Sequence, residues 1–472
     1  MRKKLLTTCF VLVSFFNMYA GGLLTNTSQN VSFLRNPARG ASMEIDAAYT
    51  NPAGLAFLNK EGLSLSLNNV SSFQTRIITT DFAPFAGFGG NSVKKFEGKA
   101  NSLVIPNLQA AYKTGNWAFS ANIGVAGGGG SMDFSKGLSS FESVTAAGAD
   151  FLKSIMPAYG FGEYSVESKL KGTSIIYGVQ LGATYKIIEN FSAYAGFRYN
   201  YVTNSYKGHL YNQLSMGGNL VPSSSIIDNP GFAQLKPLLT ALIGDKELDC
   251  KQTGSGIAPV IGLDYNWNSL NIGVKYEFKT GLELKNKTKT NTTGVKDYDD
   301  KAVTPYDIPA LFTVGAQYDF IPQLTVSAGY HHYFDSDAKM AKDRQKLING
   351  GINEYMAGVE YRINNMFLVS CGTMFTRTGT TEAFQTDMNL SLNSYSVGLG
   401  GAINITDNIR INLAYTFANY SDRSKNSTDY GNLYGTINTA TSGSLPAIPA
   451  KGGKDIFDRT NNTFGIGLDF SF

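Results

Sequence analysis

The feature of this sequence that most restricts its fold is an alternation of apolar and polar residues with a period of two. Residues 408–420 show it most clearly, because apolar side chains occupy every second position from Ile409 to Phe417. Side chains of an extended strand point alternately to its two faces, so this segment has one apolar face and one polar face. A strand of about ten residues with such faces can cross a bilayer at a tilt.

Fourteen segments share this pattern. They are residues 61–73, 103–113, 116–126, 173–186, 190–204, 254–266, 268–282, 308–319, 322–333, 351–363, 365–378, 392–404, 408–420 and 461–472. After residue 20, no apolar run reaches the roughly eighteen residues of a membrane-spanning helix. Charged residues make up 16% of the chain, which is below the quarter or so that is usual in soluble domains. The sequence therefore predicts an all-β fold, a 14-stranded antiparallel transmembrane β-barrel.

The connections between these segments alternate between short and long. The turn after the second segment consists of Thr114 and Gly115, whereas residues 127–172 and 205–253 form long connections. Bacterial outer-membrane barrels have short periplasmic turns and long external loops. With a periplasmic amino terminus, every long connection lies outside and the chain ends at Phe472 in the periplasm. An even number of strands also lets the last strand pair with the first, which removes exposed sheet edges.

The first twenty residues have the pattern of a secretory signal peptide. Positive residues 2–4 precede an apolar stretch, residues 5–16, and Ala20 precedes Gly21. The apolar stretch is too short for a transmembrane anchor. Removal of residues 1–20 takes away three positive charges and lowers the formal charge from +4 to about +1. A nearly neutral mature chain has no basic surplus for binding nucleic acid.

Residues 21–60 precede the first strand and do not alternate. They contain Asn51, Pro52, Ala53 and Gly54, where Asn51 is placed to cap a helix and Pro52 to take its first position. One interpretation is a helix packed on the periplasmic rim. The other is a plug (hatch) inside the lumen, since side chains alone do not fill a 14-stranded barrel. The predicted organisation is a plug over 21–60 and a barrel over 61–472.

These features together resemble a known family. The run A-A-Y-T-N-P-A-G-L-A-F-L at residues 47–58, the fourteen strands and the terminal Phe472 are similar to the OmpP1, FadL and TodX family, outer-membrane transporters of long-chain fatty acids and other hydrophobic compounds. Residues 307–318 are also similar to that family. The resemblance covers essentially the whole mature chain, and Asn51-Pro52-Ala53 is its most specific part. It implies that external loops capture a hydrophobic ligand, which enters the lumen and leaves sideways through the wall after the plug moves.

The resemblance further implies a gap in the wall at a kink of the third strand, residues 116–126. The residues that follow this strand are four glycines, Gly127, Gly128, Gly129 and Gly130. Glycine weakens strands and permits bulges, so these positions are the candidates for the gap. The alternative is that they only begin a flexible external loop.

Two sets of residues are candidates for ligand contact. The apolar residues in the connection 205–253 that are expected to form a capture groove are Phe232, Leu238, Leu239 and Leu242. The cations expected on lumenal faces, where a carboxylate would bind, are Arg198, Lys275 and Arg410. The alternatives are packing of the loops over the barrel mouth for the first set, and pairing with wall carboxylates such as Glu277 and Glu360 for the second.

The function predicted from these observations is passive uptake of hydrophobic small molecules, long-chain fatty acids first, across the bacterial outer membrane. The expected partners are that ligand and the outer-membrane lipids, and the expected state is a monomer. No catalytic activity, cofactor or metal is expected, because the chain has only three histidines and His331 and His332 point to opposite faces of one strand. A channel for aromatic hydrocarbons or haem is the alternative, ahead of a barrel enzyme or a general porin.

Overall fold

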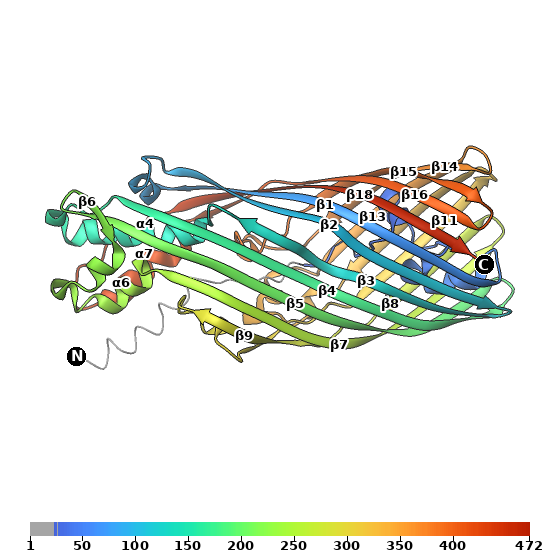
Figure 1. The fold of residues 1–472 in the computed structure, drawn as a ribbon, viewed down its shortest axis with the longest axis horizontal. Helices are drawn as coiled ribbons and strands as arrows, with labels where there is room; N and C mark the ends of the chain where they lie inside the picture. Colours follow the sequence, from blue (N-terminus) through green and yellow to red (C-terminus); the bar gives the residue numbers. More distant parts are fainter. Residues whose placement is uncertain (1–22, 26) are drawn as a thin grey trace.

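The computed structural model describes residues 23–25 and 27–472, so the predicted signal peptide lies outside the described residues. Fourteen strands form a closed antiparallel barrel (Figure 1). They are β1 (Gly62–Phe82), β2 (Val93–Thr114), β3 (Trp117–Phe134), β4 (Tyr164–Ile188), β5 (Phe191–Met216), β7 (Lys246–Trp267), β8 (Leu270–Glu277), β11 (Leu311–Ile321), β12 (Leu324–Tyr333), β13 (Ile352–Arg362), β14 (Phe367–Arg377), β15 (Ser394–Thr406), β16 (Ile409–Tyr420) and β18 (Gly453–Ser471). The 14-stranded fold class predicted from the sequence is confirmed.

The ring closes between the first and last strands. β1 pairs with β18 from Ser64 opposite Ser471 to Phe82 opposite Gly453, and β1 pairs with β2 on its other edge. Four short strands extend the wall at the external end: β6 (Asn219–Pro222), β9 (Glu283–Asn291), β10 (Val303–Pro305) and β17 (Arg423–Ser427). Closure satisfies the backbone of every wall strand except where a ladder is interrupted.

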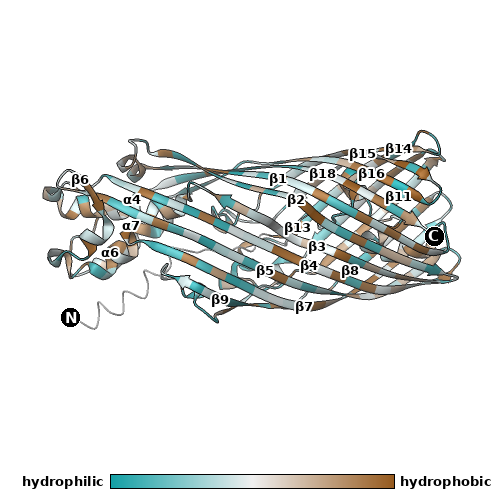
Figure 2. Cartoon of the chain, in the orientation of Figure 1, coloured by the Kyte–Doolittle hydropathy of each residue, from teal (hydrophilic) through white to brown (hydrophobic). Residues whose placement is uncertain are grey.

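The two-residue alternation places polar residues inside and apolar residues outside in the lower part of the wall. Within β16, Leu413 is 46% exposed and its neighbour Asn412 is 1% exposed. Alternating hydrophobic and hydrophilic bands run along the wall strands in Figure 2. This outer apolar belt is the surface that faces lipid, since hydrocarbon accepts apolar side chains and penalises charges.

The external part of the wall differs from the sequence prediction. Residues 74–82, 164–172 and 205–216 were expected in loops, but they continue β1, β4 and β5. Here the two faces exchange polarity: Leu170 is buried on the inside while its neighbour Lys171 is exposed on the outside. The exchange interrupts the phase of the apolar pattern, and for this reason the sequence pattern ended before the strands did.

Helices cover the external end of the barrel, at the left of Figure 1. They are α4 (Ser139–Ile155), α5 (Ser223–Ile227), α6 (Lys236–Ile243) and α7 (Leu433–Thr441), with the 3-10 turns η3 (Ala83–Gly87), η4 (Pro157–Tyr159), η5 (Pro230–Phe232), η6 (Lys296–Tyr298), η7 (Asp335–Asp337), η8 (Ala341–Leu347), η9 (Glu382–Phe384) and η10 (Tyr430–Asn432). Apolar side chains of α4, α5, α6, α7 and the turns η3, η5, η6 and η10 form one large core with the inner faces of the upper strands. We call this assembly the external cap. Among residues 23–25 and 27–472, no helix is long and apolar enough to span a bilayer.

Three short helices lie inside the lower lumen: α2 (Val31–Arg35), α3 (Ala47–Thr50) and η2 (Pro52–Phe57). Every residue of α2 and α3 is buried, and these helices contact wall strands around the ring, including β2, β7 and β16. We call residues 27–58 the plug. The rim-packing interpretation is therefore wrong. The boundaries assigned to plug and barrel from the sequence stay a prediction.

Candidate functional site

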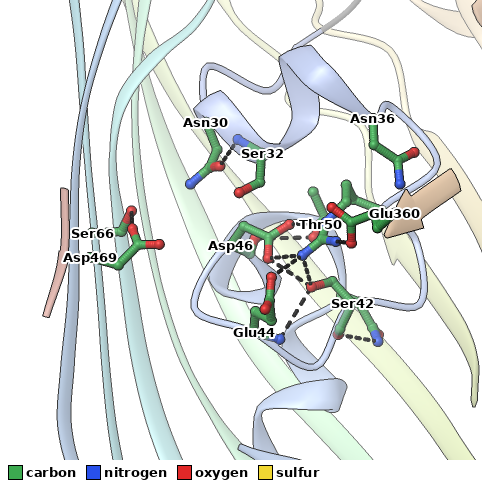
Figure 3. Close-up of polar contacts among 12 residues, drawn as sticks. Asn30, Ser32, Asn36, Ser42, Glu44, Asp46, Thr50, Ser66, Glu360 and Asp469 are labelled. Carbon is green, nitrogen blue, oxygen red and sulfur yellow. Dashed lines mark hydrogen bonds and ion pairs between the residues drawn. The ribbon is translucent and has the colours of Figure 1, made fainter. Parts of the chain in front are cut away.

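The plug is joined to the wall by a cluster of charges centred on Arg39, whose partners Glu44, Asp46 and Glu360 are labelled in Figure 3. The Arg39 guanidinium donates to Asp46 through Nε and Nη2, both at 2.7 Å, and to Glu360 on β13 through Nη1 at 2.9 Å. Glu44 accepts from Arg39 Nη2 at 2.8 Å and from Arg410 on β16 at 2.7 Å. Charges in such a place are stable only while each keeps its partner, so the cluster holds the plug to two separate strands.

The Asn51-Pro52-Ala53-Gly54 motif fastens the other side of the plug. The Asn51 side-chain amide donates to the carboxylate of Asp264 on β7 and to the carbonyl of Ser42 at 3.1 Å. Asn51 makes no capping bond to η2. The predicted cap is therefore wrong: the amide binds the wall instead of the helix, and the helix is of the 3-10 type. Pro52 does take its first position, as predicted.

The remaining motif residues fit the wall closely. The carbonyl of Pro52 accepts from Thr184 Oγ1, and the carbonyl of Ala53 accepts from Ser192 Oγ, both at 2.7 Å. A Cβ at Gly54 would lie 2.4 Å from the carbonyl oxygen of Ser42, so only glycine allows this approach. The motif thus ties one turn of the plug to β4, β5 and β7.

The three predicted lumenal cations already have partners. Arg198 donates to Glu277 at 2.6 Å, and its guanidinium lies 4.6 Å from the centre of the Tyr49 ring. Lys275 donates to the carbonyl of Tyr49 at 2.8 Å, and Arg410 pairs with Glu44 as described above. Their contact with a ligand stays a prediction, and these bonds favour the alternative of a structural network between wall and plug.

The predicted loop residues lie inside the external cap. Phe232, Leu238, Leu239 and Leu242 are at most 5% exposed. The Phe232 ring packs against Tyr159 and Phe161, with ring centres 5.5 and 6.1 Å apart. These contacts favour packing of the loops over the barrel mouth, so the proposed capture groove stays a prediction that requires the cap to open.

The wall is interrupted between β2 and β3. The ladder pairs Ala100 with Met132 and resumes only at Asn107 opposite Gly124. Two glycines on the β3 side have positive φ, +106° at Gly128 and +68° at Gly130, which disfavours residues with a Cβ. We call this interruption, bounded by residues 101–106 and 125–131, the wall gap.

The four predicted glycines lie within this gap and within β3, which continues to Phe134. The alternative that they begin an external loop is therefore wrong, and their part in ligand release stays a prediction. On the β2 side of the gap, Leu103 is 66% exposed and Val104 is 72% exposed. On the inner side, Leu24 of the amino-terminal segment packs where Gly127 has no side chain. The gap thus has an apolar outer lip and an apolar inner cover.

Above the plug, the lumen contains connected cavities that the sequence did not reveal; the first is mainly apolar, whereas the next two have mixed apolar and polar linings. One, of about 780 Å³, is lined by Leu24, Ile176 and Tyr306 among others. A second, of about 1260 Å³, shares Leu24 and Tyr306 with the first and reaches Gly128 and Gly130. A third, of about 940 Å³, extends from these glycines to Ser102 on β2. The cavities therefore run from beneath the cap to the wall gap.

Comparison with solved structures identifies the fold. A Pseudomonas aeruginosa FadL homologue matches with a TM-score of 0.62 and 14% sequence identity over 96% of this chain and 100% of its own. The Pseudomonas putida toluene transporter TodX matches with a TM-score of 0.60 and 14% identity over the same shares. The Ralstonia pickettii toluene transporter TbuX matches with a TM-score of 0.51 and 16% identity over 97% and 100%. No family model and no curated protein matches.

This protein has the fold of the FadL and TodX transporters. A closed barrel with an apolar outer belt and a plugged lumen is an outer-membrane architecture. Its location is the bacterial outer membrane.

Two arginines stand out in the second cavity of this FadL-type barrel. Arg76 on β1 and Arg459 on β18 are directly opposite in the ladder and both line the cavity. Arg459 donates to Gln74 at 2.8 Å and lies 4.3 Å from the Tyr420 ring centre. In the described chain, no carboxylate oxygen lies within 4.0 Å of either guanidinium, and both Nε atoms are buried without a hydrogen-bond partner.

Sequence reasoning missed this pair for an identifiable reason. Arg76 lies beyond the predicted first strand, 61–73, and Arg459 lies before the predicted last strand, 461–472. They meet only because the ring closes in the register that places them opposite each other. Like charges directly opposite in a ladder are destabilising, so the pair indicates a site for an anion.

Proposed function

We propose that this protein carries hydrophobic molecules passively across the outer membrane, and that its substrates are amphiphiles with an anionic head, long-chain fatty acids first. The observation that carries the proposal is the position of Arg76 and Arg459. Two cations without a carboxylate partner line a cavity of mixed apolar and polar lining that leads to the wall gap. The similar solved structures are of a FadL homologue and of toluene transporters, which supports hydrophobic uptake but not one substrate class.

The energetics of the cavity suit such a substrate. Each buried methylene of an alkyl chain contributes about 0.8 kcal/mol. A carboxylate that bridges two guanidiniums forms charge-assisted hydrogen bonds, which are roughly twice as strong as neutral ones. The bound carboxylate also removes the repulsion between Arg76 and Arg459. Both the alkyl tail and the carboxylate head of the ligand therefore contribute to the free energy of binding.

The proposed route bypasses the plug. A ligand that enters beneath the external cap reaches the cavities, and the wall gap is the nearest exit from them. Leu24 covers the gap from inside by packing at Gly127. Displacement of this segment, the part of the chain just before the plug, opens the way between Gly128 and Ser102. The exposed Leu103 and Val104 then offer the ligand an apolar passage into the bilayer.

A second candidate is an uncharged aromatic hydrocarbon. The first cavity favours it, because apolar side chains such as Leu23, Ile308 and Met340 form much of its lining. A toluene-sized molecule needs no cation, and such a ligand would leave Arg76 and Arg459 without an anion. The two candidates therefore differ in their dependence on the arginine pair.

Binding of three probes to the purified protein in detergent tests the proposal. Oleate, oleyl alcohol and toluene share an apolar body, and only oleate carries a charge. Wild type is expected to bind oleate at least about tenfold more tightly than oleyl alcohol, since a charge-assisted bond contributes about 1.5–3 kcal/mol. The Arg76→Gln/Arg459→Gln variant is expected to lose this preference and keep its affinity for oleyl alcohol.

The matched control is Arg362→Gln/Arg377→Gln, which changes two exposed arginines outside the cavities. Equal binding of oleate and oleyl alcohol by wild type would refute the anionic head as a determinant. Toluene binding that exceeds oleate binding would establish the aromatic candidate instead. Stable ion conductance through an open pore in planar bilayers would contradict a plugged transporter and favour a general porin.

A further inference from the structure

We propose that the outer surface of the barrel above the apolar belt binds the phosphate groups of glycolipid headgroups in the outer leaflet. The surface is formed by β4, β5, β7 and β9. We call its exposed cations the lysine cluster: Lys171, Lys207, Lys251, Lys285 and Lys287. The cluster faces away from the lumen, so this proposal does not depend on the transported ligand.

The register of the wall brings these lysines together. Lys171 is directly opposite Lys207 in the β4–β5 ladder, and Lys251 is directly opposite Lys287 in the β7–β9 ladder. Each pair places like charges at the closest approach that neighbouring strands allow, which is destabilising. Asp133 on β3 and Asp249 on β7 flank the first pair and compensate it in part. Lys251 has only Ser205 opposite it on β5, so a bound anion would stabilise the second pair most.

The protein neutralises the lysine cluster only in part. Lys207 lies 4.0 Å from Asp249. Within residues 23–25 and 27–472, no carboxylate oxygen lies within 4.0 Å of Lys171, Lys251, Lys285 or Lys287. Acidic residues also lie among the lysines: Asp133 on β3 is opposite Lys171, Asp249 on β7 is opposite Lys207, and Glu283 is two residues from Lys285 on β9. A local excess of positive charge therefore remains on this surface.

The surface also has a hollow that can hold a phosphate group. Lys171 and Lys207 line a hollow of about 930 Å³ together with Lys169, His209 and the two carboxylates Glu247 and Asp249. Gly208, between two of these residues on β5, also lines it and contributes no side chain. The hollow therefore places three lysines around an open centre against two carboxylates, and a phosphate would bind on its lysine side.

The height of the lysine cluster above the apolar belt matches the position of lipid headgroups. On β4, β5 and β7 the exposed apolar belt ends at Tyr177, Tyr201 and Ile257. Lys171, Lys207 and Lys251 each follow six residues farther out along their strand. At about 3.3 Å per residue and a tilt of about 40°, this places the amines about 15 Å above the belt. That height lies beyond the hydrocarbon and within the layer of sugars and phosphates, and in Figure 2 hydrophilic bands cross these strands there.

Native mass spectrometry of the full mature protein tests the proposal. The probes are a bisphosphorylated lipid A, the same lipid after enzymatic dephosphorylation, and inorganic phosphate. Wild type is expected to retain the phosphorylated lipid, and the variant K171Q/K207Q/K251Q/K287Q is expected to bind it at least about tenfold more weakly, since each lysine near an anionic surface contributes. The corresponding K→Arg variant keeps the charges and is expected to bind like wild type.

The matched control is K95Q/K236Q/K339Q/K346Q, which removes the same charge from exposed lysines outside the cluster. The proposal requires this control to bind like wild type. Equal retention of the dephosphorylated lipid would overturn it, as would unchanged binding by the cluster variant. Displacement of the lipid by millimolar inorganic phosphate would show a site for free anions and would also overturn the lipid assignment. Oleate binding by the cluster variant is expected to be unchanged, which keeps this test separate from the proposed transport.

Discussion

The lower and upper zones of the wall have opposite polarity. In the lower zone, apolar side chains such as Leu413 face outward and polar ones such as Asn412 face the plug. In the upper zone, Lys171 and Lys207 are exposed outside, whereas Leu170 and Tyr206 are buried inside. The same strands thus contact lipid in the lower zone and water in the upper zone. Their inner faces are polar in the lower zone and apolar in the upper zone.

This difference shows where an apolar ligand is stable inside the barrel. The lower lumen is filled by a plug that hydrogen bonds and ion pairs attach to the wall, so an apolar molecule would have to break them to pass. The upper lumen has cavities with mainly apolar or mixed linings that end at the wall gap. The gap lies where the two zones meet, so a ligand leaves sideways at the level at which the outside becomes apolar.

Locking the wall gap is expected to have the largest effect. A Cβ at position 130 would lie 4.0 Å from the Cβ of Ser102, within the range for a disulfide. In a background without the free cysteines Cys250 and Cys371, the S102C/G130C variant is expected to lose uptake almost completely when oxidised. Uptake of radiolabelled oleate by cells measures this. Gly130 has a φ of +68°, so the cysteine costs about 1–2 kcal/mol in stability.

Reduction of the same variant provides the control, because it removes the bond and keeps both substitutions. Uptake is expected to return on reduction. If cells with the oxidised variant take up oleate as fast as cells with the reduced variant, the ligand does not leave through this gap. The difference between the two zones would then not determine the exit route.

Removal of Arg39 is expected to have the next largest effect, on the lower zone. Arg39→Ala leaves the buried carboxylate of Asp46 without a cation and leaves Glu360 only its ion pair with Arg35 at 3.4 Å, which costs about 3–5 kcal/mol. The plug should detach while the barrel stays folded. Planar-bilayer conductance is expected to rise, and heat-modifiable migration on gels is expected to stay that of a folded barrel. Arg362→Ala, at an exposed position, should leave the conductance at its low wild-type level; a closed Arg39→Ala channel would show that the cluster does not hold the plug.

A smaller loosening of the plug is expected from Asn51→Ala. The carboxylate of Asp264 loses the Asn51 amide but keeps the amide of Asn271 at 3.0 Å. The loss of one bond to a charged group costs about 1.5–3 kcal/mol. Amide hydrogen exchange in residues 40–58 should become faster and oleate uptake should fall, with barrel strands unchanged. Asn349→Ala, at an exposed loop position, is the control; unchanged exchange in the plug would mean that the motif is not an anchor.

The smallest expected effect concerns the external cap and its dependence on pH. Burial raises the pKa of Asp455 to about 6, although Thr80 and Tyr430 donate to its carboxylate and Lys425 lies nearby. Asp387 opposes its ionisation further. Since the folded pKa lies above the unfolded value of about 3.9, this stabilisation is complete below pH 4 and is lost as the pH rises through 6.

The cap is therefore expected to be more stable at pH 5 than at pH 7.5 by about 1 kcal/mol from this group. Hydrogen exchange of α7, corrected for intrinsic rates, measures the difference. Asp455→Asn should abolish most of it, because an amide does not titrate. A pH dependence that is unchanged in Asp455→Asn would assign the effect to Asp387 or another group.

The sequence alone determined the lower zone. Segments of membrane-spanning length that alternate with a period of two can form only one structure in lipid. Only a closed barrel gives every backbone N–H and C=O group of such strands a hydrogen-bond partner there. Segments 103–113 and 351–363 alternate less regularly than the others but were placed correctly: β2 covers the first, and β13 covers the second except for its two end residues. Pairing with neighbouring strands fixes which residues of each strand face hydrocarbon, and the sequence alternates accordingly at these positions.

Only the tertiary structure decided the upper zone and the site. The outer faces there meet water, so nothing in the local pattern distinguishes an extended strand from a polar loop. Arg76 and Arg459 are separated by almost the whole chain, and ring closure alone places them opposite each other. The capping role expected of Asn51 was wrong for the same reason: the nearest partner of its amide is Asp264, which the sequence places far away and the barrel brings close. The pattern along the chain indicates whether each face of a strand contacts lipid, water or the protein interior. Contacts across a closed ring depend on the register between strands, and no local segment of the sequence encodes that register.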